Sequence, residues 1–85
     1  MRSFMKRPRD AQGQKNISGI RIKLLREKAK LSQRQLAQQL QLSGIDMDKN
    51  VVTRIETNKR YVSDFELRAL AHVLDTTYEY LLEGK

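Results

Sequence analysis

Residues 32–56, SQRQLAQQLQLSGIDMDKNVVTRIE, decide how this chain folds. Helical spacing in the first part of the stretch puts three residues on one inward face: Leu36, Ala37 and Leu40. The same spacing over residues 49–57 gives a second helix, and its inward face carries Val52, Ile55 and Glu56. Gly44 marks a turn between the two. The stretch therefore predicts two short helices joined by a polar turn.

The ends of these two helices carry capping residues. Ser32 followed by Gln35 is a capping box, in which side chains and backbone satisfy each other's free N–H groups. Asp48 is the expected N-cap of the second helix. Asn58 follows that helix, and asparagine ranks next to glycine at a left-handed C-cap. Both helices therefore have a signal for where they begin.

The outward face of the second helix is short, polar and basic: it carries Lys49, Asn50, Thr53 and Arg54. Such a face suits insertion into a groove of DNA, where these side chains can contact base edges. Phosphate contacts are expected nearby, from Gln33, Arg34, Lys59 and Arg60. The alternatives are plain solvent exposure for Gln33, and interaction with the negative end of the helix for Lys59 and Arg60.

Three further helices flank this pair. The first begins near Asn16 or Ser18 and ends near Lys30, with a stripe of Ile22, Leu25 and Ala29. The next opens with a capping box, Ser63 and Glu66, and carries the strongest periodic signal: Leu67, Leu70, Ala71 and Leu74. Thr76 and Glu79 repeat the box before a short last helix, which either completes the core or supplies a dimer contact.

Two opposite charges lie on inward faces. Arg26 falls inside the apolar stripe of the first flanking helix, and Glu56 lies on the inward face of residues 49–57. A buried charge without a partner is costly, so we expect Arg26 and Glu56 to form an ion pair at the edge of the core. The alternative is two separately solvated charges.

Length and composition limit the functions available. The 85 residues allow one domain with a small core, and the absence of cysteine excludes disulfides and thiolate–metal sites. We expect no membrane segment, no metal or other cofactor and no enzymatic activity, since apolar runs are short and no catalytic constellation is evident. His72, the only histidine, falls off the apolar stripe and is expected to be exposed. The net charge of +7 favours polyanionic partners.

Residues 1–15, MRSFMKRPRDAQGQK, differ from the rest. Five basic residues against one acid leave +4 here, more than half of the total of +7. The segment has no helical or strand periodicity and little apolar surface, which predicts a disordered basic arm before a domain over residues 16–85. The arm either lies along DNA phosphates or in a minor groove, or is a solvated tail.

Taken together, LSQRQLA, VVTRIE, TNKR and ELRALAHVLDTTYEYLL resemble the phage-repressor-like family of Cro and lambda repressor, also called XRE, over about residues 17–82. The resemblance implies an all-α, compact five-helix helix-turn-helix domain whose third helix lies in the major groove. It implies base contacts from Lys49, Asn50, Thr53 and Arg54, phosphate contacts from Gln33, Lys59 and Arg60, and the Arg26–Glu56 pair. The chain departs from the family in having Asn58 where glycine is usual.

The connection over residues 43–47 is a second departure from the family. The resemblance implies that this connection is about five residues longer than is usual in the family. Ile45 or Met47 is expected to fill the core gap that this extra length creates.

The expected function is a sequence-specific, double-stranded DNA-binding transcriptional regulator, a repressor, in the cytoplasm and encoded by a bacterium or phage. One helix reads few base pairs, so we expect a homodimer on a palindromic operator, without a small-molecule ligand. One alternative is an antitoxin-like or adaptor module that mainly binds a partner protein. Another is a basic domain that coats nucleic acid without sequence preference.

Overall fold

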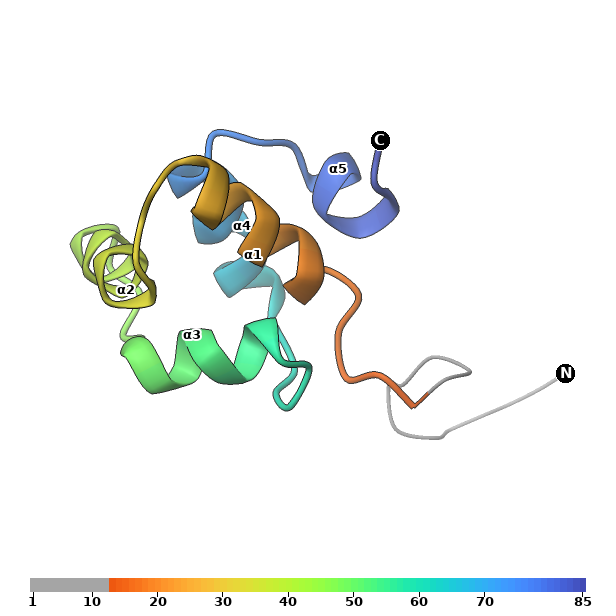
Figure 1. The fold of residues 1–85 in the computed structure, drawn as a ribbon, viewed down its shortest axis with the longest axis horizontal. Helices are drawn as coiled ribbons and strands as arrows, with labels where there is room; N and C mark the ends of the chain where they lie inside the picture. The colour runs from red at the N-terminus through yellow and green to blue at the C-terminus, as the bar shows by residue number, and fades with distance from the viewer. Residues whose placement is uncertain (1–12) are drawn as a thin grey trace, which may run out of the picture.

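The computed structural model describes residues 13–85, and all the regular structure in this part of the chain is helical (Figure 1). The five helices are α1 (Gly19–Lys28), α2 (Gln33–Leu42), α3 (Lys49–Glu56), α4 (Asp64–Val73) and α5 (Tyr78–Glu83). The expected all-α, five-helix class is confirmed. The first twelve residues of the expected basic arm lie outside the described residues. None of the described helices is long and apolar enough to cross a membrane.

The helices pack so that α3 lies along one edge of the molecule. α2 and α1 both contact α3, α4 packs on α2, and α5 packs on α4 and α1. Figure 1 shows α3 at the lower edge of the view, with the other helices on its upper side. Because the other helices pack on one side of α3, no other helix covers its outer side.

The core draws on all five helices and on one loop residue. Its buried members are Ile22, Leu36, Ala37, Leu40, Met47, Val52, Ile55, Leu70, Ala71 and Leu81. Met47 belongs to the long connection between α2 and α3 and is only 1% exposed, while Ile45 packs against the core half-buried. Burying a side chain of this size stabilises a fold by about 1.5–3 kcal/mol. The expectation that this connection fills the core is confirmed.

Most of the expected helix caps are present. Ser32 and Gln35 form a capping box, Ser63 and Glu66 form another, and the Asp48 carboxylate accepts from the N–H of Val51 at 2.9 Å. The capping box expected for the last helix is wrong. That helix begins one residue later, with Thr77 as N-cap accepting from the N–H of Tyr80, and tyrosine has no carboxylate to complete the box.

The first helix is shorter than its pattern predicts. Its N-cap Ser18 makes no side-chain cap, and the Oδ1 of Asn16 accepts from the N–H of Gly19 at 2.7 Å instead. The expectation that Ala29 belongs to the buried stripe is wrong, because α1 ends at Lys28 and Ala29 is its exposed C-cap. The buried residues of α1 are Gly19, Ile22 and Arg26.

Candidate nucleic-acid interface

The two faces of α3 differ sharply. Val52, Ile55 and Glu56 are buried, whereas Lys49, Asn50 and Arg54 are exposed, and Thr53 is half-buried between them. The aliphatic side therefore packs on the core, and the polar side points away from it. This is the arrangement that a helix needs in order to enter a DNA groove while remaining part of a stable domain.

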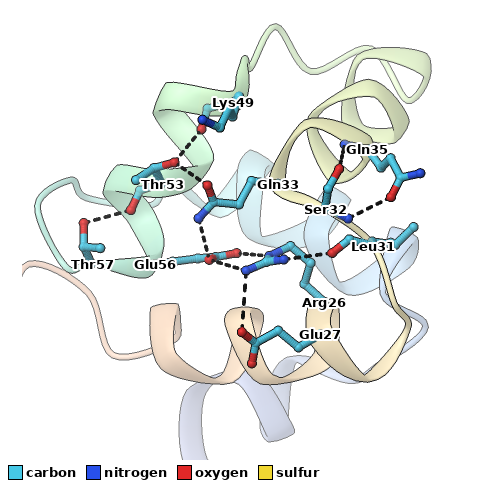
Figure 2. Close-up of polar contacts among 10 residues, drawn as sticks. All are labelled: Arg26, Glu27, Leu31, Ser32, Gln33, Gln35, Lys49, Thr53, Glu56 and Thr57. Atoms are coloured by element: carbon cyan, nitrogen blue, oxygen red, sulfur yellow. Dashed lines mark hydrogen bonds and ion pairs between the residues drawn. The ribbon is translucent and has the colours of Figure 1, made fainter.

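Arg26 and Glu56 form a buried ion pair between α1 and α3 (Figure 2). The Nε of Arg26 donates to Glu56 Oε2 at 2.6 Å, and its Nη2 donates to Oε1 at 3.0 Å. The Nη1 donates to the carbonyl of Leu31 at 2.8 Å. These bonds to Glu56 raise the pKa of Arg26 although burial alone lowers it. The pair fixes α3 against α1 and the turn before α2.

Gln33 joins this pair to the outer side of α3. Its Nε2 donates to Glu56 Oε1 at 3.0 Å, and its Oε1 accepts from the hydroxyl of Thr53 at 2.7 Å (Figure 2). The Thr53 oxygen also lies 3.0 Å from the carbonyl of Lys49. We call the connected side chains Arg26, Glu56, Gln33 and Thr53 the polar chain. Both ends of the Gln33 carboxamide, and the Thr53 hydroxyl, are thus used inside the protein.

At the start of α3, three expected DNA contacts come together. Arg34 of α2 and Lys49 and Asn50 of α3 line one shallow depression between the two helices. All three are exposed. The N-cap Asp48 lies on the same rim, where its carboxylate is held by the backbone of α3. Two cations and a carboxamide therefore face outward around one helix end.

The two basic residues after α3 have different surroundings. Lys59 is exposed, whereas the guanidinium of Arg60 makes a two-fold ion pair with Glu66 of α4, at 2.9 and 3.0 Å. The bonds from Arg60 lower the pKa of Glu66, and those from Glu66 raise the pKa of Arg60. Asn58 has a φ of 65°, so the expected left-handed C-cap is confirmed. Of the two cations, Lys59 faces outward and Arg60 is bound to α4.

Two contacts with the C-terminal end of α3, made by Gly19 and Asn16, do not follow from the sequence pattern. Gly19 opens α1 directly against the C-terminal end of α3, and a Cβ there would collide with the carbonyl oxygen of Ile55. Asn16 donates its Nδ2 to the same carbonyl at 3.2 Å and to that of Arg60 at 2.8 Å. Helical periodicity carries no sign of either contact. A glycine at the expected start of a helix was the one available hint.

His72 is exposed on α4, as expected. Among residues 13–85, no group of three or more acidic or histidine side chains is arranged to hold a metal ion.

Comparison with known proteins places this geometry in a family. A helix-turn-helix family model matches residues 22–81, and the chain therefore belongs to the helix-turn-helix family, of the phage-repressor-like type. A similar solved structure is that of the P22 c2 repressor protein in complex with synthetic operator 9T in the presence of Tl⁺. It has a TM-score of 0.70 and 24% identity, over 82% of this chain and 98% of that chain. No functionally curated protein matches this chain in sequence.

Family and site together define the class of protein. The chain is a sequence-specific DNA-binding regulator of transcription, and the expected function is confirmed at this level. The alternative of a module that mainly binds a partner protein is not favoured.

Proposed function

We propose that this regulator is a repressor that binds a palindromic operator in double-stranded DNA as a homodimer, with α3 of each copy in the major groove. The observation that carries the proposal is the exposed polar side of α3, which the polar chain fixes to α1 and α2 from behind. A base-reading helix must be held rigidly, because direct readout depends on hydrogen-bond geometry.

Base readout is assigned to the residues that α3 exposes. Lys49 suits the O6 and N7 atoms of guanine, and Asn50 suits the N6 and N7 atoms of adenine. Arg54, further along the helix, suits guanine or a neighbouring phosphate. The Thr53 hydroxyl already donates inside the protein, so its remaining contribution is methyl contact with thymine. A good two-fold contact contributes about 1–3 kcal/mol of discrimination.

Phosphate binding is assigned first to Arg34, which lies near the start of α3, and to Lys59, which follows its end; both are exposed. Gln33 and Arg60 were expected to act in the same way. In the free protein, Gln33 is bonded to Glu56 and Thr53, and Arg60 to Glu66, so a phosphate must compete with these partners. We therefore propose them as weaker phosphate contacts than Arg34 and Lys59.

The dimer contact is assigned to α4 and α5. Phe65, Tyr78 and Leu82 line a common apolar hollow there and are 66%, 50% and 38% exposed. An apolar surface shared by two helices is removed from water when a second copy covers it. Substituting Phe65 with Asp should leave the monomer folded and reduce cooperative operator binding. We further propose a cytoplasmic location and no enzymatic activity.

The test begins with selection of bound duplexes from random DNA, which should return a palindromic sequence. On that operator, Asn50→Ala should weaken binding by about 5- to 150-fold, which corresponds to 1–3 kcal/mol. Binding to random DNA should change little, because phosphate contacts remain. Gln39→Ala, an exposed carboxamide on α2, is the matched control and should leave both affinities unchanged. Equal losses on operator and random DNA after Asn50→Ala would remove the case for readout by α3.

The repressor assignment has its own test. A reporter whose promoter overlaps the selected operator should be silenced by the wild-type chain and not by Asn50→Ala. Increased expression would instead identify an activator.

A further inference from the structure

A row of exposed aliphatic side chains runs along the outer side of α1. Ile17, Ile20 and Leu24 are 44%, 60% and 52% exposed. Ile20 and Leu24 lie one helical turn apart, and Ile17 lines a common hollow with Ile20 beside the end of α5. We call these three residues the outer row. A single exposed aliphatic residue is ordinary in a soluble protein, whereas three in sequence along one helix form a continuous apolar surface.

The outer row is separate from the side of α1 that the core uses. Ile22 and Arg26 are buried, and Figure 2 shows Arg26 pointing toward Glu56 of α3. Ile20 and Leu24 each lie two positions from Ile22, which is about 200° around an α-helix. They therefore lie on the side of α1 opposite the contact with α3. A partner bound to the outer row would leave the exposed polar side of α3 free for DNA.

The charges beside the outer row favour an acidic partner. Lys23 and Lys28 lie three and four residues after members of the row, so they are its neighbours on the helix surface. Both are exposed, and neither has an acidic partner among residues 13–85. The acid beside them, Glu27, lies 4.0 Å from the Arg26 guanidinium. A second copy of this chain is disfavoured, because two outer rows face to face would bring like charges together.

We propose that the outer row of α1 is a docking surface for an amphipathic helix of another protein, one whose apolar side is flanked by Asp or Glu. Seven helical positions span about 10 Å, so two turns of the partner helix, with apolar residues at i, i+4 and i+7, cover the row. Its acidic residues then meet Lys23 and Lys28. The chain thereby holds a second protein while α3 is on the operator, which adds a function to DNA binding.

The experiment measures the binding of three labelled synthetic peptides to the full-length chain by fluorescence anisotropy. The first is an acidic amphipathic helix with leucines at i, i+4 and i+7 and glutamates beside them. The second has the same composition with the leucines scrambled out of the row, and the third has lysine in place of each glutamate. The acidic amphipathic peptide should bind at least about tenfold more tightly than either of the others, because it alone combines an apolar row with acidic flanks.

Two sets of variants test the residues. Ile20→Asn combined with Leu24→Asn should remove the preference for the acidic amphipathic peptide. Leu42→Asn, which changes another exposed aliphatic side chain at the end of α2, is the matched control and should keep it. Lys23→Glu combined with Lys28→Glu should transfer the preference to the lysine peptide. All these side chains are exposed, so circular dichroism should show an intact fold.

The outcomes are distinct from those for the proposed function. Equal binding of the scrambled and amphipathic acidic peptides would mean attraction by net charge alone, and the inference would be wrong. It would also be wrong if Ile20→Asn with Leu24→Asn keeps the preference, if these changes abolish self-association in sedimentation, or if the operator displaces the peptide. A wild type without operator preference would overturn the proposed function and leave docking on α1 intact, because peptide binding is measured separately.

Discussion

Removing the Glu56 carboxylate should destabilise the domain more than any surface substitution. Three hydrogen bonds converge on that carboxylate, two from Arg26 and one from Gln33. Its side chain is 1% exposed and that of Arg26 is 10% exposed. Glu56→Leu would leave the guanidinium with the Leu31 carbonyl and a distant Glu27 carboxylate at 4.0 Å. An uncompensated buried charge of this kind costs about 3–5 kcal/mol.

That loss is most of the free energy of unfolding of a small domain, since total stabilities begin near 5 kcal/mol. Arg26→Met alone should cost a similar amount, because it leaves the carboxylate buried without its cation. Arg26→Met combined with Glu56→Leu removes both charges together. The double variant should therefore be near wild-type stability, so the coupling between the two sites should approach the sum of the two single losses, about 6–10 kcal/mol.

Urea unfolding followed by circular dichroism gives the four free energies of this cycle. Glu56→Gln, which keeps the shape of the side chain, replaces Glu56→Leu if the latter is unfolded in buffer. The reasoning is refuted if the two single losses simply add in the double variant, because additive sites do not interact.

Three other predictions concern stability. Gly19→Ala should destabilise by about 1–3 kcal/mol despite better helix propensity, because the new Cβ meets the Ile55 backbone; thermal unfolding measures this, and a raised midpoint contradicts it. Met47→Ala should cost about 2–5 kcal/mol in urea unfolding, whereas a loss near zero would show that the connection does not support the core. The pKa of Glu66 is lower in the folded state, so its stabilisation is present at neutral pH and is lost as pH falls through that pKa. Glu66→Gln should remove this part of the stability that is lost in acid, about 0.2–1 kcal/mol for a partly exposed pair. The free energy of unfolding measured between pH 7 and 3 checks this, and a pH dependence equal to that of the wild type contradicts it.

Features that depend on local sequence could be predicted well. The stripes of α2, α3 and α4 follow from side-chain spacing, and the capping boxes at Ser32 and Ser63 follow from two residues three apart. The Arg26–Glu56 contact could also be predicted, because a cation and an acid on inward faces each require a partner.

Features that depend on two distant side chains meeting could not be predicted in the same way. The hydrogen bonds that the carboxamides of Asn16 and Asn58 make lie between an irregular segment and a turn, where no periodicity says which way a carboxamide points. Glu66 was recognised as part of a capping box, and its Oε1 does accept from the N–H of Ser63. The same carboxylate also binds Arg60, and nothing in the local pattern requires the second contact.

The long connection between α2 and α3 raises the question of what sets the angle of the reading helix. A short turn would fix that angle through the backbone, whereas a longer one leaves it to side chains. Met47 anchors the connection in the core, and the Nε2 of Gln41 donates to its carbonyl at 2.9 Å. At the opposite end of α2, Gln33 bridges to Glu56 and Thr53 of α3. The connection is thus held at the C-terminal end of α2 by Gln41 and Met47, and α3 itself is joined to the N-terminal end of α2 by Gln33. The Gln33 contacts do not depend on the length of the turn, and they help α3 to keep its outward polar face.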